Sequence, residues 1–256
     1  MYRLQRKLYS QNFLRSRKLT SHLVKGSSIN KNDLVLEIGP GEGIITEQLV
    51  QKAKHVIAVE IDHTLYKGLQ VKFRHVRNLT LYLNNFLNFP LPKVPHKVFA
   101  NVPFSIEGKI IRKLIDAKNP PEDTYLVIRT KLAYRLSGHH KENQFSVLHK
   151  PWFDFSIFHH FRQTDFIPAT KVKSAVLRFK KREVPLIPWK ELGNYRNFIQ
   201  VGFGQGMSVA HNIRKRLGYK KSMRILYNAR IDNKAKPGYL NLEQWIGLYT
   251  EFKNFL

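Results

Sequence analysis

The segment Asn101-Val-Pro-Phe104 combines residue types that suit a planar nucleic-acid base. The amide of Asn101 can accept a hydrogen bond from an exocyclic amine, and the ring of Phe104 offers a face for stacking. The proline between them fixes the turn. The motif follows an apolar run, Lys97–Ala100, and the carboxyl end of a strand is where open α/β sheets bind ligands. Taken alone, the four residues also fit a loop Asn beside a core Phe.

A second candidate site is the glycine-rich segment Glu37-Ile-Gly-Pro-Gly-Glu-Gly43, between an apolar run and a stretch with helical spacing. Glycines at such a place let the backbone approach a ligand closely. Glu60 ends the next apolar run, about 20 residues further on, where an acid can accept hydrogen bonds from ribose hydroxyls. Asn85 follows the third run and could hydrogen-bond an adenine ring. These features predict a nucleoside site, and an ordinary tight turn between strand and helix is the alternative.

The acids of the loop favour one class of nucleoside cofactor. Glu37 and Glu42 would repel a pyrophosphate at the start of the following helix, which disfavours a nicotinamide dinucleotide. A ligand with a cationic centre and no phosphate would not be repelled. S-adenosylmethionine has a ribose, an adenine and a positive sulfonium, and we expect it as the cofactor.

The charge of the chain indicates a polyanionic partner. Lys and Arg number 44 and Asp and Glu 18, a net charge of +26 over 256 residues. Nucleic acid is the first candidate for such a surplus. Residues 1–32 contain no acid and form a basic arm suited to a phosphate backbone. A membrane surface is the weaker alternative, because the charge is spread along the chain and no amphipathic anchor stands out.

Composition also excludes several classes. Cysteine is absent, so disulfides, cysteine zinc sites and thiol nucleophiles are ruled out. The pairs His139-His140 and His159-His160 lack the spacing of a metal site, and we expect no metal. We expect no membrane association and a cytoplasmic location, since no signal peptide and no apolar run of about 20 residues is found.

Apolar runs typical of strands alternate with segments of helical spacing. The expected strands are Leu34–Ile38, His55–Glu60, Leu79–Leu83, Lys97–Ala100 and Tyr125–Ile128. The helical segments between them are Ile44–Lys52, Asp62–Arg74 and Ser105–Ala117. This alternation predicts a doubly wound, mostly parallel α/β sheet. Two later runs, Trp152–Phe161 and Ala175–Phe179, predict an antiparallel closure of one sheet edge.

Pro185 and Pro188 indicate a linker, and the chain beyond them has helical spacing. We therefore expect three parts: a basic arm over residues 1–32, a catalytic domain over 33–182, and a small all-helical, RNA-binding domain over 183–256.

The motifs resemble those of the rRNA adenine-N6 dimethyltransferases in order and spacing. They are Gln11-Asn-Phe-Leu14, Glu37 to Gly43, Val59-Glu-Ile-Asp62, Asn101-Val-Pro-Phe104 and Phe166-Ile-Pro-Ala-Thr-Lys-Val-Lys-Ser-Ala-Val176. Within this family the chain is most similar to the macrolide-resistance (Erm) methyltransferases that act on large-subunit rRNA. The small-subunit dimethyladenosine transferases are the other branch.

The resemblance implies a class I methyltransferase fold and a role for each matching residue. The implied cofactor-binding residues are Gln11, Asn12 and Leu14, which close over the cofactor, Gly39 and Gly41 in the loop, Glu60 and Ile61 at the ribose, and Asn85, Phe86 and Asn101. Asn101 and Phe104 are the implied catalytic residues. The chain departs from the family at Asn85, where Asp is usual, at Lys173, where Asp is usual, and at Ala169.

The resemblance further implies S-adenosylmethionine-dependent methylation of N6 of an unpaired or flipped-out adenine in 23S rRNA, with macrolide-type antibiotic resistance as the outcome. Two alternatives stay open: a small-subunit rRNA dimethyladenosine transferase, and a non-catalytic RNA-binding or transcription factor on a methyltransferase fold. We expect a monomer in each case.

Overall fold

The computed structural model describes residues 13–204 and 207–255, and the chain divides into two compact units. The first, the sheet unit, comprises residues up to 133 together with 156–181. The second, the helical unit, comprises residues 134–155 together with 182 onward. Relative to the expected boundary at residue 183, the helical unit therefore also takes in residues 134–155.

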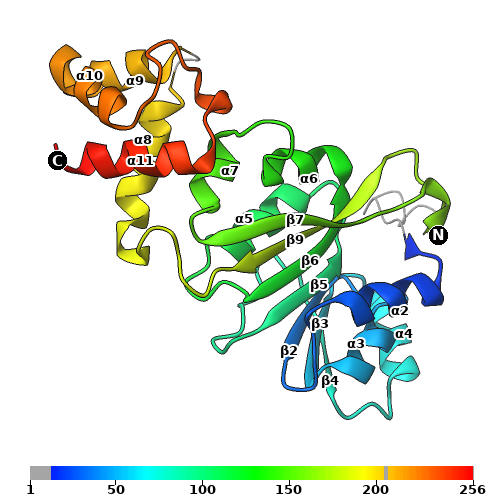
Figure 1. The fold of residues 1–256 in the computed structure, drawn as a ribbon. Coiled ribbons are helices and arrows are strands. Elements are labelled where there is room, and N and C mark those ends of the chain that lie inside the picture. Colours follow the sequence, from blue (N-terminus) through cyan, green and yellow to red (C-terminus); the bar gives the residue numbers. More distant parts are fainter. Residues whose placement is uncertain (1–12, 205–206, 256) are drawn as a thin grey trace. The chain divides into compact units, whose positions relative to one another are not determined.

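The central element is a seven-stranded sheet with the order β4-β3-β2-β5-β6-β9-β7 (Figure 1). Its strands are β2 Leu34–Ile38, β3 His55–Glu60, β4 Leu79–Leu83, β5 Lys97–Asn101, β6 Asp123–Arg129, β7 Phe153–His160 and β9 Ser174–Lys181. β4, β3, β2, β5 and β6 pair in parallel, and β9 pairs antiparallel to β6. The predicted doubly wound, mostly parallel sheet is confirmed. The order reverses between β2 and β5, which creates the crevice where such sheets bind ligands.

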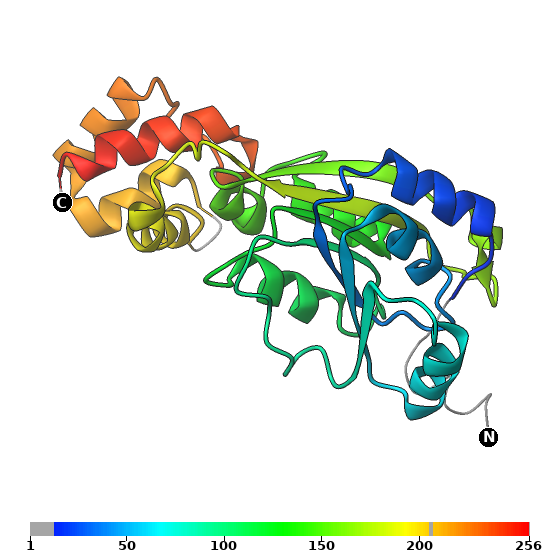
Figure 2. The same ribbon diagram turned by 90° about the horizontal axis from the view of Figure 1, so that it is seen from below.

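Helices cover both faces of the sheet (Figures 1 and 2). These helices are α2 Arg17–Gly26, α3 Thr46–Lys52, α4 His63–Lys72 and α5 Glu107–Ile115. The helices α2 and α3 pack with Val35, Phe99 and Tyr125 in one core cluster, in which Phe99 and Tyr125 stack at 5.6 Å between ring centroids. Val98 and Leu126 are also buried, and they point to the opposite face of the sheet from their neighbours Phe99 and Tyr125. That face is covered by the buried apolar side of α5.

Part of the basic arm is folded onto the sheet unit. The short strand β1, Phe13–Leu14, pairs antiparallel with β8, Phe166–Ile167. Ser16 then caps α2 by accepting a hydrogen bond from the backbone N–H of Leu19. Leu23 is fully buried in the core cluster, while the basic side chains of α2 lie outside it.

The helical unit has its own core. Its helices are α7 Gln144–His149, α8 Leu192–Gly202, α9 Val209–Leu217, α10 Tyr219–Asn228 and α11 Leu242–Lys253, and α6 Thr130–Ser137 leads into it from β6. Short 3-10 turns of this unit lie at η2 Trp189–Glu191 and η3 Pro237–Tyr239, and a third, η1 Gln163–Asp165, lies in the sheet unit. Trp245 and Phe198 pack edge to face in the centre of this core. Gly202 lies against the Trp245 ring, where a side chain would have no room.

The helices of the described ranges are all too short or too polar to span a lipid bilayer.

Candidate active site

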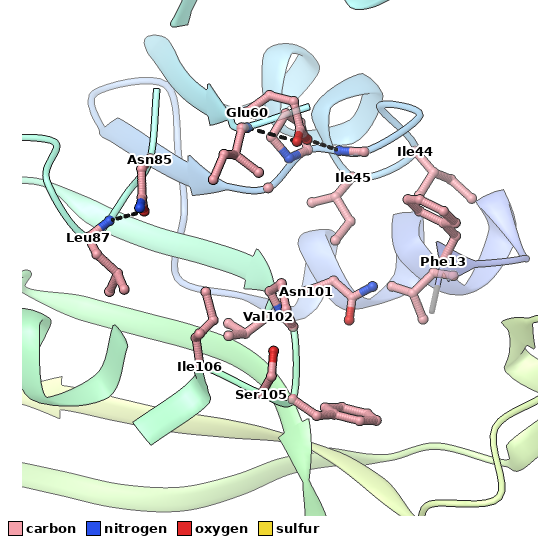
Figure 3. Close-up of a pocket in the computed structure, with 17 residues that line it drawn as sticks. Phe13, Ile44, Ile45, Glu60, Asn85, Leu87, Asn101, Val102, Ser105 and Ile106 are labelled. Carbon is pink, nitrogen blue, oxygen red and sulfur yellow. Dashed lines mark hydrogen bonds between the residues drawn. The ribbon is translucent and has the colours of Figure 1, made fainter. Parts of the chain in front are cut away.

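A cavity of about 300 Å³ opens at the carboxyl ends of β2, β3 and β5 (Figure 3). Its walls come from the glycine loop, from the residues after β4 and from the loop after β5. The lining residues are Phe13, Leu14, Gly39, Pro40, Gly41, Ile44, Ile45, Glu60, Ile61, Asn85, Leu87, Asn101, Val102, Pro103, Phe104, Ser105 and Ile106. A mostly apolar wall with a few convergent polar groups is typical of a site for a nucleoside-sized ligand.

The glycine loop is shaped by three glycines with left-handed backbone conformation, of which Gly39 and Gly41 line the cavity and Gly43, with φ +82, ends the loop. Gly39 has φ +64 and Gly41 has φ +60, values that side chains disfavour. A Cβ on Gly39 would meet no atom within 4 Å, so this face of the loop is open to a ligand. A Cβ on Gly41 would lie 2.6 Å from Cε1 of Phe13, so the loop and β1 approach each other closely here.

Glu60 is the carboxylate of the cavity. Its Oε2 accepts the backbone N–H of Gly41 at 3.0 Å, and its Oε1 accepts those of Ile61 and Asp62 at 2.9 Å each. Burial raises the pKa of Glu60, and the three N–H groups oppose that shift. A carboxylate offers about four acceptor directions, so about one remains for a ligand hydroxyl.

The expectation that Glu37 and Glu42 face the cofactor is wrong, because neither side chain lines the cavity. Glu37 is buried behind the loop, and its Oε2 accepts the hydroxyl of Thr46 at 2.7 Å. Burial, with a contribution from the charge of Glu60, raises the pKa of Glu37 to about 8, which favours the protonated, neutral form at pH 7. Glu42 lines a neighbouring cavity together with Arg17. Glu60 is therefore the acidic side chain that lines the cavity itself.

Asn85 lines the cavity after β4, and its Oδ1 accepts the backbone N–H of Leu87 at 3.0 Å (Figure 3). Leu87 contributes the apolar surface beside it. Phe86 is 5% exposed and is not among the lining residues. Its ring lies 4.9 Å from Nζ of Lys113, which also takes the backbone carbonyl oxygen of Phe86 as an acceptor at 2.8 Å. Phe86, an implied cofactor-binding residue, therefore lies beside the cavity wall between two lining residues and does not itself line the cavity.

The loop after β5 carries Asn101 and Phe104. Asn101 is the last residue of β5, in register with Val127 of β6, and Figure 3 shows its amide directed into the cavity. The backbone N–H of Val102 donates to the carbonyl oxygen of Val127 at 3.2 Å. A turn then follows, because the N–H of Ile106 donates to the carbonyl oxygen of Pro103 at 3.1 Å. Sheet pairing therefore fixes the backbone of Asn101, and Phe104, in the turn, lines the same cavity.

The structure brings most of the sequence candidates together. Leu14, Gly39, Gly41, Glu60, Ile61, Asn85, Asn101 and Phe104 all line this cavity. Gln11 and Asn12 lie outside the described residues. The apolar lining from Ile44, Ile45 and Ile106 was not predicted as part of the site, since in the sequence these residues serve equally as helix core. Among the described residues, no group of His, Asp and Glu side chains is arranged to hold a metal ion.

Comparisons with known proteins agree with this geometry. The small-subunit rRNA methyltransferase A of Nostoc sp. is 30% identical over 261 residues, covering 95% of this chain and 96% of that protein. The mycinamicin-resistance protein MyrB of Micromonospora griseorubida is 28% identical over 244 residues, covering 95% of this chain and 78% of that protein. The crystal structure of the 23S rRNA methyltransferase ErmE superposes with a TM-score of 0.86 and 26% identity, covering 94% of this chain and all of that one.

The family model described as ribosomal RNA adenine dimethylase matches residues 3–254. That span includes the glycine loop, Glu60, Asn101 and Phe104. The chain therefore belongs to the ribosomal RNA adenine dimethylase family.

Proposed function

We propose that this protein transfers a methyl group from S-adenosylmethionine to N6 of an adenine in 23S rRNA, and that the modification confers macrolide-type resistance. The observation that carries the proposal is that Asn101 and Phe104 line the same cavity as Gly39 and Glu60. A base-recognition motif and a nucleoside-binding loop at one cavity are what a methyl donor and an acceptor base require.

The residues present fit S-adenosylmethionine. Gly39 leaves open space beside the backbone, Glu60 keeps an acceptor direction for a ribose hydroxyl, and Ile61 and Leu87 offer apolar surface to an adenine ring. None of these groups repels a cation, which agrees with the positive sulfonium centre. When bound, this cofactor supplies an electrophilic methyl group.

Asn101 and Phe104 would act on the acceptor base. The N6 lone pair of adenine is delocalised into the ring, so the amine is a poor nucleophile. The amide oxygen of Asn101 accepts a hydrogen bond from the adenine amine. This bond orients the lone pair of N6 toward the methyl group. Stacking on Phe104 holds the ring in place. The target adenine must be unpaired or flipped out to enter the cavity.

Transfer of labelled methyl groups tests this mechanism. Wild-type protein, Asn101→Ala and the control Asn84→Ala are incubated with tritiated cofactor and protein-free rRNA. Asn84 is exposed and is not a lining residue, so its variant should match the wild type. We expect Asn101→Ala to lose at least a hundredfold in rate, and equal transfer by all three proteins would refute the assigned role.

Methylation of small-subunit rRNA is the second candidate, and the 30% identity to the Nostoc small-subunit enzyme favours it. The 0.86 TM-score over the whole of the ErmE chain supports the large-subunit assignment. Mass spectrometry of rRNA from cells with and without this protein distinguishes the two functions, because it shows whether the large-subunit or the small-subunit rRNA carries the added methyl groups. Calorimetry with S-adenosylmethionine addresses the non-catalytic alternative, which predicts no binding at millimolar ligand.

A further inference from the structure

The helix pair α9–α10 carries a dense group of exposed cations and aromatic rings. The exposed residues of this group are Arg214, Lys215, Arg216, Tyr219, Lys220, Lys221, Arg224 and Tyr227, here called the α9–α10 surface. Residues 209–231 contain no Asp or Glu. The carboxylates of the helical unit come from other segments of the chain. Glu251 of α11 accepts a hydrogen bond from Asn228 at the end of α10 at 2.7 Å, and Glu191 pairs with Lys253 at 3.0 Å.

The apolar residues of both helices are used inside the unit. Ile213 of α9 and Ile225 and Leu226 of α10 are buried, so the helices are held by their own core. Tyr219 and Tyr227 are 61% and 83% exposed and contribute little to that core. Burial in the core of the unit therefore does not account for these two large rings.

The arrangement of the cations and rings is regular. Lys220, Arg224 and Tyr227 follow each other at intervals of four and three residues, so they share one side of α10. At the start of α10, the guanidinium of Arg214 lies 4.8 Å from the ring centroid of Tyr219. Gly218, with φ +79, makes the sharp connection that brings these two together.

We infer that the α9–α10 surface binds an unpaired stretch of rRNA, with Tyr219 and Tyr227 stacking on bases and the cations contacting phosphates. Cations along a surface with interleaved aromatic rings are the pattern by which proteins hold single-stranded nucleic acid. The inference rests on the proposed function for the identity of the RNA. It adds an anchoring site on the helical unit, separate from the cavity that receives the target adenine.

An anionic membrane is the other polyanion to consider, and the structure argues against it. A helix that lies on a bilayer inserts an apolar side into the lipid. In α10 the apolar side, with Ile225 and Leu226, is already buried in the protein. What remains exposed is cationic and phenolic, which suits phosphates and bases.

Filter binding to protein-free 23S rRNA over a salt series tests the inference. We expect Tyr219→Ala combined with Tyr227→Ala to weaken binding at least fivefold. We expect Lys220→Ala combined with Arg224→Ala to lower the slope of log affinity against log salt by about 1.5. Both double variants should raise KM for rRNA and leave kcat within twofold, and Tyr227→Phe should retain wild-type binding.

The control is Lys190→Ala combined with Lys234→Ala, which removes two exposed charges from the same unit outside this surface. Affinities and salt slopes equal to those of this control would overturn the inference. It would also be overturned if the variants lost binding to phosphatidylglycerol vesicles while rRNA affinity stayed at the wild-type value. The binding assay needs no methyl transfer. If the protein methylated no rRNA, the proposed function would be refuted, but the filter-binding results would still support or overturn the RNA-binding role of the α9–α10 surface.

Discussion

Arg129 and Glu107 form an ion pair, with Nε 2.5 Å from Oε1, between the end of β6 and the start of α5. Glu107 is 2% exposed and also accepts the backbone N–H of Arg129 at 3.1 Å. The same guanidinium donates through Nη2 to the carbonyl oxygen of Phe104 at 3.4 Å. The pair therefore links the loop that carries Phe104 to a strand and to a helix.

Removal of this link should slow the reaction without weakening cofactor binding. In Glu107→Ala the guanidinium loses its partner, and the position of the Phe104 loop is no longer fixed. Misplacement of reacting groups by about 1 Å can cost up to a hundredfold in rate. We expect kcat to fall at least tenfold while the Kd for S-adenosylmethionine changes less than twofold, as measured by single-turnover transfer and calorimetry.

The matched control is Arg178→Gln, which breaks the ion pair of Arg178 with Asp123, 2.6 Å apart, at the opposite end of β6. This variant should lower the melting temperature and leave kcat unchanged well below it. If both variants lose the same fraction of kcat, Glu107 acts through stability and has no positioning role.

Replacement of Asn85 by Asp should tighten cofactor binding. Oδ1 of Asn85 already accepts the N–H of Leu87, and the other end of the amide is a donor that cannot accept from an adenine amine. An Asp keeps the bond to Leu87 and offers a second, charged acceptor, which makes a stronger hydrogen bond. We expect the Kd for S-adenosylmethionine to fall about fivefold in calorimetry. Asn84→Asp adds the same charge one residue away, and equal Kd values for the two variants would place the adenine amine elsewhere.

The sheet was predictable because its strands are short apolar runs separated by helical spacing. His55–Glu60 and Leu79–Leu83 coincide with the observed strands, and the runs of β5 and β6 were placed to within two residues at each end. The helix α2 was missed, although Ser16 and the spacing of Leu19 and Leu23 are typical of a capped amphipathic helix. Its basic residues were attributed to an arm, since composition does not show which face of a helix is buried.

The candidate site was predictable where function depends on strand ends. Glu60, Asn85 and Asn101 each end or follow a parallel strand, so sheet topology alone brings them together. The role of Glu37 was not predictable, because its place behind the loop depends on the contact with Thr46 nine residues later. Burial in the folded protein raises the pKa of Glu37 and so favours its neutral form, whereas the sequence alone indicated a charged side chain.

Gly41→Ala should damage the cavity. The backbone of Gly41 is left-handed, which costs a residue with Cβ about 1–2 kcal/mol, and the new methyl group would lie 2.6 Å from the Phe13 ring. Phe13 lines the cavity, so its displacement should weaken S-adenosylmethionine binding at least tenfold. In Gly108→Ala, the control within α5, the methyl group meets no atom within 4 Å. That variant should gain about 0.5–1 kcal/mol of stability and keep its affinity. Equal affinity for both variants would exclude close packing of the loop as a requirement for binding.

The neutral state of Glu37 predicts a distinct dependence of stability on pH. Its pKa is about 8 in the folded protein and about 4.5 in the unfolded chain, so between these values the folded state holds a proton that the unfolded state has lost. The free energy of unfolding must therefore fall as pH rises from about 4.5 to 8, by a few kcal/mol in order of magnitude. Urea unfolding at pH 5, 6.5 and 8 should show a steeper fall for the wild type than for Glu37→Gln.

The contribution of Glu60, whose pKa is also raised, is present in both proteins and cancels in their difference. Glu243→Gln removes an exposed carboxylate, and its curve should run parallel to that of the wild type. If the Glu37→Gln curve is also parallel, the folded protein holds Glu37 as an anion throughout this range. The cofactor cavity would then be bordered by two carboxylates, and the electrostatic attraction for a sulfonium would have to be assigned to Glu37 as well as to Glu60.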